Sequence, residues 1–459
     1  MSRSLLPKQL QALTGSRTMI QETVLRTADP DAFKSPIVVS NEEHRFDIAA
    51  QLEDAGITPF AHVLEPAGRN TAAATAVAAL LAMERDPEAI LLIMPSDHAI
   101  SGREAFRSDL AQAAPLADAG ELVLFGIEAD APATGYGYIV RGAALNGAAA
   151  GYRVDRFVEK PSREEALGLI ESGRAYWNSG LFLMRGDAVM KELSRHRPAI
   201  VDACAEAVTK AARSPDFVRL DSDAFLRSPS EPIDKAVMEN SDRLIVLPAR
   251  FGWSDIGSWS ALWEVSTRDG DGNAIVGDAL LQASRNCYVR TDKTFVAAVG
   301  LEDTIIVEDG DAVLVCARSH ANDVKDVVAR MKAEGRRQHL NHLHVTRPWG
   351  RFETVAAGRN HQVKLLTIKP GASLSLQFHR RRSEHWLVVQ GKAEVHLDGQ
   401  TRVLGPTQSI DIPMGAPHRL SNAGTEPLLV VEVQMGSYLG EDDIVRLEDA
   451  YRRPVAKPN

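Results

Sequence analysis

The hydrophobic and polar positions of residues 1–262 alternate between two kinds of segment. Short, continuous apolar runs, such as SPIVVS, AILLIMPSD and ELVLFGI, are typical of parallel strands that are buried on both faces. Between them lie helical stretches such as RNTAAATAVAALLAMERD. Because strands that alternate with helices build sheets covered by helices on both faces, this region is predicted to form a doubly wound α/β domain.

The pattern changes after this domain. Residues 270–318 contain short strand-like runs with turn signals, which predict a small β module resembling a β-helix. Residues 319–338 predict an amphipathic helical linker that ends at Gly335. Gly, Pro and Asn turns at strand-length intervals predict an all-β jelly roll over residues 341–436. The acidic run GEDDIVRLEDAYRR predicts a closing helix within residues 437–459.

The composition restricts the classes of function. The chain has 459 residues and a net charge of −9 without a long basic tract, which argues against non-specific nucleic-acid binding. Its three cysteines, Cys204, Cys287 and Cys316, are scattered and are expected to be reduced core residues. No apolar stretch is long enough to cross a bilayer, and the first residues lack the apolar region of a secretory signal. We therefore expect a cytoplasmic protein whose partners include neither nucleic acid nor a membrane.

The stretch GASLSLQFHRRRSEHWLVVQG places metal-ligand side chains at strand spacing. Gln377 and His379 are two positions apart, so on a strand they point to the same face. Glu384 follows a basic turn, and the segment PMGAPHRLSN adds His418 in the next candidate hairpin. Two nitrogens, a carboxylate and an amide oxygen suit a divalent ion such as Zn²⁺. The spacing G-x5-Q-x-H-x4-E-x6-G, followed by P-x-G-x2-H-x3-N, resembles the two cupin motifs with Gln in place of the first His.

Polar residues also follow several predicted strands of the N-terminal domain, where this architecture forms its ligand crevice. Asp97 comes directly after a buried strand, and Asp255 lies in a loop flanked by Gly and Trp. Two carboxylates brought together could hold Mg²⁺ against substrate phosphates. Glu159 and Lys160 pair an acceptor with a cation, and Asn178 occupies a tight turn. Singly, such residues are more often structural or solvated, so a functional interpretation depends on the order of the motifs along the chain.

That order resembles a known family. The segments PKQ, EPAGRNTAAA, MPSDH, TGYGYI, FVEKP, WNSG, IDKAVME and GWSDIGSW resemble the sugar-nucleotide pyrophosphorylases, specifically the mannose-1-phosphate guanylyltransferases. The tail, from TRPWGRFE through SLQFHRRRSEHW to YLGEDDIVRLEDAY, resembles the mannose-6-phosphate isomerase half of the bifunctional (type II) enzymes. The resemblance covers nearly the whole chain.

The resemblance implies two reactions on the route to GDP-mannose. The N-terminal half would join mannose 1-phosphate to GTP and release diphosphate. By similarity, Asp97 and Asp255 would hold Mg²⁺, Lys160 would contact the sugar phosphate, and Lys8 would belong to the catalytic residues. In-line phosphoryl chemistry needs positioning and charge neutralisation, which this set provides.

The resemblance also implies binding residues. Glu159, Asn178 and the loop at Gly135 would bind the mannose hydroxyls. The nucleotide would lie near Arg3 and the GRNTA segment, which contains Gly68, Arg69, Asn70 and Thr71. A homo-oligomer is a further expectation.

The cupin half would interconvert fructose 6-phosphate and mannose 6-phosphate, with a metal that polarises the carbonyl and a base that carries the proton. The sequence does not identify that base. Strand parity places His385 on the face opposite to Glu384, which makes it the weaker candidate, and Glu432 and Lys364 are alternatives. Arg381 and Arg382 could bind the substrate phosphate or merely solvate the turn. Family members commonly carry further histidines where this chain has arginines, so the phosphate contacts are expected to differ.

A second departure concerns the N-terminus. The family opens with a strand and a Gly-Gly-x-Gly-x-Arg loop, and this chain matches it only from Ser2-Arg3 onward. The glycines would bring backbone N–H groups against the nucleotide phosphates, and the strand belongs to the middle of the sheet. Without them we expect unpaired neighbouring strands and poor guanylyltransferase activity. A coding sequence that begins upstream of Met1 is the preferred explanation.

Two alternatives remain. The first is an isomerase whose N-terminal domain is an inactive scaffold, which the missing loop favours and the retained Asp97, Lys160 and Asp255 oppose. The second is a non-enzymatic sugar or nucleotide sensor, because cupins also serve as sensing domains. Four intact metal ligands and the lack of a DNA-binding pattern argue against the sensor.

Overall fold

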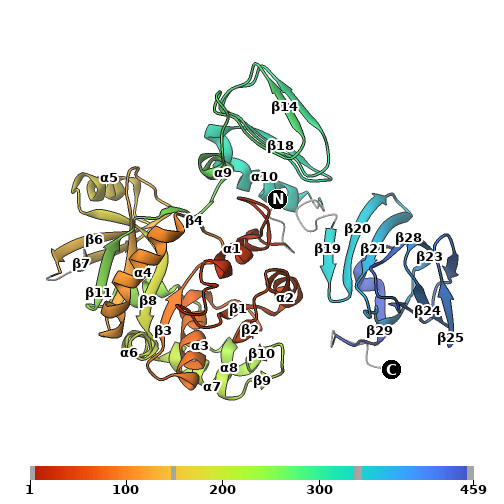
Figure 1. Ribbon diagram of the computed structural model, residues 1–459, viewed down its shortest axis with the longest axis horizontal. Coiled ribbons are helices and arrows are strands. Elements are labelled where there is room, and N and C mark those ends of the chain that lie inside the picture. Colours follow the sequence, from red (N-terminus) through yellow and green to blue (C-terminus); the bar gives the residue numbers. More distant parts are fainter. Residues whose placement is uncertain (1–5, 146–150, 335, 337–343, 452–459) are drawn as a thin grey trace.

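The computed structural model describes residues 6–145, 151–334, 336 and 344–451. An α/β body, a small β module and a C-terminal β domain follow one another along the chain (Figure 1). Within the described residues, no helix combines the length and the hydrophobicity that crossing a membrane requires.

The larger sheet of the α/β body has six strands in the order β3-β8-β5-β11-β7-β6. The strands are β3 (Ile90–Ile93), β8 (Ala175–Arg185), β5 (Leu122–Glu128), β11 (Leu244–Pro248), β7 (Tyr152–Glu159) and β6 (Gly137–Ala144). β5 and β11 are parallel, whereas β8 runs antiparallel to both β3 and β5. The doubly wound α/β fold is therefore confirmed, with a mixed sheet at its centre.

A second sheet has the order β1-β2-β10-β9. Its strands are β1 (Ile37–Asn41), β2 (Ala61–Glu65), β10 (Val218–Arg219) and β9 (Ala212–Arg213). β1 pairs with β2, β3 pairs with β8, and in the described residues neither pairs with a strand on its other side. In the described residues β1 and β3 are therefore edge strands of their sheets.

Helices cover both faces of the larger sheet. On β5, Leu122 and Leu124 face the cluster that contains α3, whereas Val123 and Phe125 face the cluster that contains α4. Five of the seven alanines of α3 are buried, and their small side chains let α6 and α7 pack closely against it. The helices of the body are α1 (Met19–Leu25), α2 (Arg45–Asp54), α3 (Asn70–Arg85), α4 (Arg103–Asp118), α5 (Arg163–Glu171), α6 (Gly186–His196), α7 (Pro198–Thr209), α8 (Ser222–Leu226) and α9 (Trp259–Val265).

Two short strands connect this body to its loops and are important for the site. β4 (Ala99–Ser101) pairs with β12 (Gly252–Ser254), so the chain after Asp97 lies beside the chain before Asp255. Pairing between segments that are distant in the sequence thus brings the two predicted carboxylate loops together.

The β module is built of parallel coils. β13 (Ala274–Val276), β15 (Tyr288–Arg290) and β17 (Thr304–Glu308) pair in parallel, as do β14 (Ala279–Gln282) and β16 (Val296–Val299). Antiparallel β18 (Val313–Ala317) closes the stack. The predicted β-helix is therefore present. The predicted linker consists of a 3₁₀ turn at Arg318–Asp323 followed by α10 (Val324–Ala333).

The C-terminal domain is a two-sheet jelly roll. One sheet has the order β19-β20-β21-β28-β23-β26, with β19 (His344–Arg347), β20 (Gly350–Ala357), β21 (His361–Ile368), β28 (Leu428–Gly436), β23 (Arg382–Gln390) and β26 (Ser409–Ile412). The other has the order β25-β24-β27-β22-β29, with β25 (Gln400–Leu404), β24 (Ala393–Leu397), β27 (His418–Asn422), β22 (Leu376–His379) and β29 (Ile444–Glu448). An apolar core that includes Trp349, Phe352 and Trp386 fills the space between them.

The predicted closing helix is wrong in the described residues. A 3₁₀ turn at Glu441–Asp443 leads into strand β29, which pairs antiparallel with β22. Ile444 and Val445 are β-branched and favour a strand. In addition, β22 offers an edge whose backbone groups need partners, and this tertiary demand outweighs the local helical pattern.

Candidate active sites

The jelly roll gathers three predicted metal ligands at its centre. His379 on β22, Glu384 on β23 and His418 on β27 are each at most 2 % exposed. One potential ligand atom from each lies within 4.8 Å of the others. Because three different strands supply them, the cluster forms only when both sheets are assembled.

The two imidazoles turn their Nε2 atoms toward Glu384. The His418 Nδ1 donates to the carbonyl of Ala416 over 2.9 Å, which directs its Nε2 into the cluster. The His379 Nε2 lies 2.9 Å from the Glu384 Oε1. Within the described residues neither Nε2 forms a hydrogen bond, although both are buried. Buried nitrogens of this kind need a partner, and a divalent cation would fit between them.

The electrostatics also favour a cation. Burial would raise the pKa of Glu384, but His379, His418 and Arg382 outweigh it and hold the pKa well below the usual range. Burial lowers the pKa of His418 and favours its neutral form. A carboxylate and a neutral imidazole are the ionisation states in which these groups bind metals.

Gln377 lies beside this cluster. It is 8 % exposed and pairs with His418 between β22 and β27. Its Oε1 accepts a hydrogen bond of 2.8 Å from the Ser375 hydroxyl. Its amide oxygen is thus oriented by the protein, and its role as a fourth ligand stays a prediction.

Three side chains hold Glu384 in place. Arg382 Nε and Gln434 Nε2 each donate to Oε1 over 3.2 Å, and Trp386 Nε1 donates to Oε2 over 3.1 Å. Arg382 is 1 % exposed and also donates to the carbonyl of Gly440, so it does not solvate the turn, whereas Arg381 is exposed. The Gln434 contact depends on the register between β23 and β28 and was not accessible from the sequence, whereas Arg382 and Trp386 lie two positions from Glu384 on the same face of β23, so strand parity could have indicated them.

The candidates for the isomerase base lie on two different faces of the sheet, one toward solvent and one toward the interior. His385 points away from the ligands and binds Asp411 on the surface, as strand parity predicts. Lys364 and Glu432 lie opposite each other on β21 and β28 and are both buried. Burial and the nearby charge of Glu384 raise the pKa of Glu432. The Lys364 Nζ donates to Glu441 over 2.5 Å.

The α/β body brings Lys8, Asp97 and Asp255 together. The Lys8 ammonium lies 3.1 Å from the Asp97 Oδ2 and also donates to the backbone carbonyl of Asp255. The Asp255 Oδ1 accepts hydrogen bonds of 3.0 Å from the Tyr136 hydroxyl and from the N–H of Gly257. Lys8 therefore places one positive charge between the two predicted carboxylate loops, which the sequence did not reveal.

Glu159, Lys160 and Asn178 form a second group. The Lys160 Nζ lies 3.2 Å from the Glu159 Oε1, and Asn178 donates to Asp234 over 2.8 Å. A Cβ at Gly137 would meet the Glu159 Oε2 at 2.7 Å and the Asn178 Cβ at 3.3 Å, so the two side chains flank that glycine. Asp234 lies in the IDKAVME motif but was not predicted as a site residue. Burial and Glu159 raise the pKa of Asp234 to about 6.

The GRNTA segment begins α3. Asn70 has a positive φ of 65°, and its side chain accepts the N–H of Thr71. The Thr71 hydroxyl accepts the N–H of Ile233, and Arg69 donates to the carbonyl of Leu226. Gly68 and Gly135 are exposed. The predicted residue Arg3 lies outside the described residues.

Comparison with known proteins covers each part of the chain. Residues 1–272 match the family described as nucleotidyl transferase, and residues 278–331 match a mannose-phosphate isomerase/GMP-like β-helix domain. Residues 334–449 match the family described as mannose-6-phosphate isomerase C-terminal.

Relatives match over almost the full length. The chain is 50 % identical over 453 residues to the xanthan biosynthesis protein XanB of Xanthomonas campestris, covering 99 % of this chain and 96 % of that one. It is 47 % identical over 457 residues to the mannose-1-phosphate guanylyltransferase ManC of Salmonella typhimurium, covering 99 % and 95 %. A crystal structure from Thermus thermophilus, described as a mannose-1-phosphate geranyltransferase, is similar with a TM-score of 0.63 and 31 % identity, covering 72 % of this chain and 94 % of that one.

Proposed function

This chain belongs to the family of bifunctional (type II) mannose-1-phosphate guanylyltransferases and mannose-6-phosphate isomerases, and we propose which of its residues serve each reaction. It is an enzyme of GDP-mannose biosynthesis, with a nucleotidyltransferase domain and a mannose-6-phosphate isomerase domain. The isomerase-only and sensor alternatives are not favoured.

For the isomerase, His379, Glu384, His418 and Gln377 hold one divalent ion, and Zn²⁺ suits their nitrogen and oxygen donors. Such an ion would polarise the carbonyl of the substrate and neutralise the charge of an enediolate. The observation that carries this proposal is the pair of buried Nε2 atoms that face Glu384 without a hydrogen-bond partner in the described residues.

The remaining isomerase residues either orient the Glu384 carboxylate or transfer a proton. Arg382, Trp386 and Gln434 fix the Glu384 carboxylate, so that its position does not depend on bound metal. Glu432 and Lys364 both face the interior and are the two candidates for the group that moves the proton between carbons 1 and 2. His385 is set aside because it faces the surface.

For the guanylyltransferase, Asp97 and Asp255 hold Mg²⁺ together with the phosphates of GTP, and Lys8 neutralises phosphate charge. Support comes from the Lys8 ammonium, which already rests between the two loops and indicates that a cation is favoured there. Lys160 contacts the phosphate of mannose 1-phosphate, and Glu159, Asn178 and the Gly135 loop bind its hydroxyls. The segment Gly68, Arg69, Asn70 and Thr71 lies near the guanine.

We also place the enzyme in the cytoplasm. Cys204, Cys287 and Cys316 are all free thiols, which is typical of proteins in a reducing compartment. A homo-oligomer is proposed as well, and light scattering of the purified protein tests it.

The two metal assignments are tested by chelation in one preparation. After treatment with EDTA and dialysis, both activities should be lost. Zn²⁺ added in equimolar amount should restore the isomerisation of mannose 6-phosphate, and Mg²⁺ in millimolar amount should restore GDP-mannose synthesis. Isomerase activity that survives complete removal of metal would refute the role of the three-ligand cluster.

A further inference from the structure

Helix α2 lies on the side of the α/β body that faces the jelly roll, where it contacts β19 (Figure 1). The Phe46 ring meets the Tyr451 ring edge-on, with 6.5 Å between the centroids. The Glu53 carboxylate lies 3.8 Å from the Lys369 ammonium. Asp47 lies between these two contacts along the helix. The first domain therefore touches the isomerase domain through charged as well as aromatic side chains.

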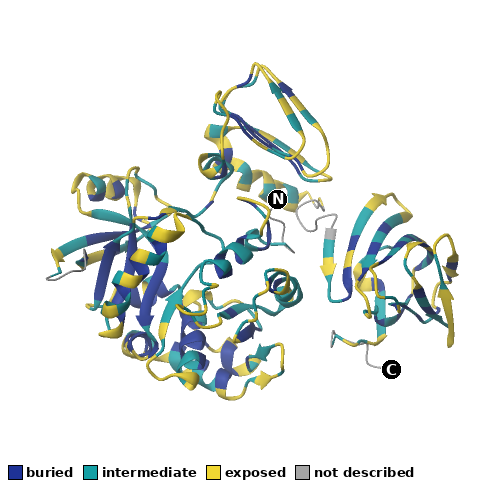
Figure 2. Cartoon of the chain, in the orientation of Figure 1, coloured by how far each residue is buried: buried dark blue, intermediate teal, exposed yellow. Residues whose placement is uncertain are grey.

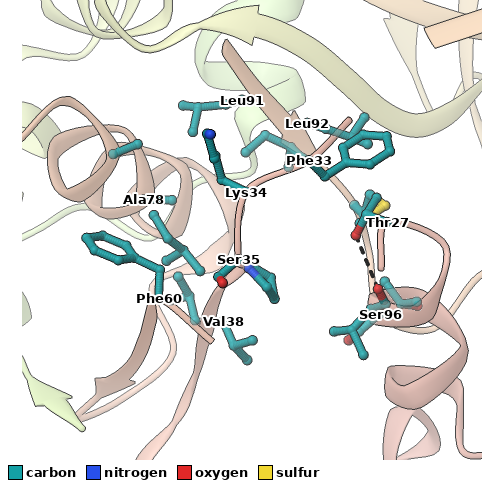
Figure 3. Close-up of a pocket in the computed structure, with 18 of the residues that line it drawn as sticks. Thr27, Phe33, Lys34, Ser35, Val38, Phe60, Ala78, Leu91, Leu92 and Ser96 are labelled. Carbon is teal, nitrogen blue, oxygen red and sulfur yellow. Dashed lines mark hydrogen bonds between the residues drawn. The ribbon is translucent and has the colours of Figure 1, made fainter. Parts of the chain in front are cut away.

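The other side of α2 belongs to the α/β body. Ile48 and Leu52 are the buried residues of the helix, and its remaining positions are partly buried or exposed (Figure 2). Ile48 also lines a cavity of about 1230 Å³ in this body, as do Val38 and Phe60 (Figure 3). In the described part of the chain, that lining includes neither Asp47 nor any residue of the jelly roll. The contact between the domains is therefore separate from the cavity.

Asp47 interacts with two residues of β19, Thr346 and Arg347. Burial raises the pKa of Asp47, and the charge of Arg347 and a hydrogen bond from the Thr346 side chain act against that rise. A carboxylate of one domain thus acts on a cation of the other. Opposite charges across an interface fix the register of the two surfaces.

Arg347 is also the first member of a row of alternating charges inside the jelly roll. Its guanidinium lies 3.8 Å from the Glu441 Oε2, and the Lys364 ammonium lies 2.5 Å from the Glu441 Oε1. The Lys364 side chain is 5 % exposed, whereas that of Glu441 is 43 % exposed. Glu441 is therefore held from both sides, and a change at Arg347 alters the contact that Glu441 makes with the buried lysine.

The row ends at the proposed isomerase site. Lys364 and Glu432 lie directly opposite each other on β21 and β28. The Trp386 Nε1 donates to the Glu432 Oε1 over 3.2 Å and to the Glu384 Oε2 over 3.1 Å. The Gln434 amide also donates to both carboxylates. Lys364 thus faces a carboxylate that shares its donors with a proposed metal ligand.

We propose that Asp47, although it belongs to the nucleotidyltransferase domain, is a positioning residue for the isomerase reaction. It restrains Arg347, and Arg347 and Glu441 in turn fix Lys364 opposite Glu432. The inference rests on the proposed function, in which Lys364 and Glu432 are the candidates for proton transfer. A proton-transfer group must lie within hydrogen-bond reach of the substrate, so a small displacement slows the chemical step.

The test compares variants of the full chain in the isomerisation of mannose 6-phosphate. Asp47→Asn should lower kcat about three- to tenfold and change KM by less than about twofold, because the chemical step and not substrate binding is affected. GDP-mannose synthesis and the metal content should stay unchanged. Asp47→Glu keeps the charge and should recover most of kcat.

Two further variants separate the row of charges from simple docking of the domains. Glu53→Gln removes an ion pair from the same helix and the same interface, but Lys369 has no place in the row, so kcat should stay unchanged. In an Arg347→Gln background, adding Asp47→Asn should cause no further loss of kcat, because the two residues act through one contact.

Three results would overturn the proposal. It fails if Asp47→Asn keeps the kcat of the wild type, if Glu53→Gln lowers kcat as much as Asp47→Asn, or if the effects of Asp47→Asn and Arg347→Gln multiply. Lys364→Met distinguishes this failure from that of the proposed function. If Lys364→Met retains full kcat, the assignment of Lys364 is wrong and this proposal falls with it. If Lys364→Met loses kcat while Asp47→Asn does not, only the role of Asp47 is refuted.

Discussion

The two candidate sites hold their carboxylates in opposite ways. Glu384 of the jelly roll is 2 % exposed and receives hydrogen bonds from three neighbouring side chains. The Asp97 side chain of the α/β body is 42 % exposed; the Lys8 ammonium lies 3.1 Å from its Oδ2, and the His98 Nε2 lies 3.8 Å from its Oδ1. The isomerase site is thus oriented by the protein before any ligand binds. The guanylyltransferase site leaves part of that orientation to its substrate and metal.

The largest effect that would test this comparison is expected from His418→Ala. It removes a proposed metal ligand from the enclosed site, so isomerase activity should fall at least about a hundredfold, while GDP-mannose synthesis stays unchanged. Coupled assays for fructose 6-phosphate and for GDP-mannose, with metal analysis by mass spectrometry, measure this.

The control for His418→Ala is His385→Ala. His385 lies next to Glu384 in the sequence but faces the surface, so its removal should leave metal content and isomerase activity intact. If both variants lost metal equally, the cluster would not be the site.

A substitution at Asp97, in the more exposed site of the α/β body, should affect the guanylyltransferase reaction and not the isomerase reaction. Asp97→Asn should lower GDP-mannose synthesis about 10²- to 10³-fold, because a carboxylate proposed to position Mg²⁺ is lost, and should spare isomerase activity. Since Asp97 is partly exposed, the thermal midpoint should change by less than about 1 °C. Asp155→Asn, at a surface ion pair with Arg174, is the control. A large loss of stability in Asp97→Asn would break the comparison.

A smaller effect is expected when the support of Glu384 is weakened. Arg382→Met should reduce metal affinity about 10- to 100-fold, because a ligand that loses its orienting partner binds less well. Arg382→Lys should restore part of that affinity. Competition with a chelating dye measures it.

The matched control is Arg381→Met, which changes the exposed neighbour. If Arg381→Met and Arg382→Met weakened metal binding alike, general charge near the site rather than the buried contact would be responsible.

The smallest effect is expected for a buried carboxylate outside both sites, and it measures how much such a group contributes to the stability of the protein without a metal. Glu308 of the β module is buried without any proposed metal. Burial raises its pKa, but hydrogen bonds outweigh this and lower it to about 2. The donors are the N–H groups of Asp292, Lys293 and Gly310 and the hydroxyl of Thr291.

Because the folded pKa of Glu308 lies below the unfolded value, the carboxylate stabilises the protein above about pH 5 by up to about 3 kcal/mol. This contribution is lost as the pH falls through the folded pKa near 2. The difference in thermal midpoint between wild type and Glu308→Gln should therefore be largest at neutral pH and vanish near pH 2. Glu302→Gln, at an exposed ion pair with Arg285, should give a small difference. A constant difference at all pH values for Glu308→Gln would contradict the assignment.

Hydrophobic and polar periodicity in the sequence predicted the features that depend on neighbouring residues, such as the face of a strand to which a side chain points. Gln377 and His379 could be assigned to one face because the period of a strand is two residues. The same rule placed His385 on the surface. Alternation of apolar runs with helices predicted the α/β body, and β5 is as buried as its sequence indicates.

Features that depend on long-range pairing were not accessible in this way. The contact of Gln434 with Glu384 arises from the register between β23 and β28. Lys8 contacts Asp97, which lies 89 positions later in the sequence, and Asp255, which lies 247 positions later. The segment of β29 has a composition that suits a helix or a strand, and only its pairing with β22 decides between them.

That pairing has a consequence for the order in which the enzyme becomes competent during its synthesis. The strand that carries Gln377 and His379 is held on one side by β29, whose last residue is Glu448. The α/β body is complete on the ribosome long before this residue is made, and domains fold as units as they emerge. The nucleotidyltransferase half can thus fold while the isomerase half still lacks its final strand, and a ribosome that stalls before the codon for Ile444 would release a chain in which β22 has no partner on that side.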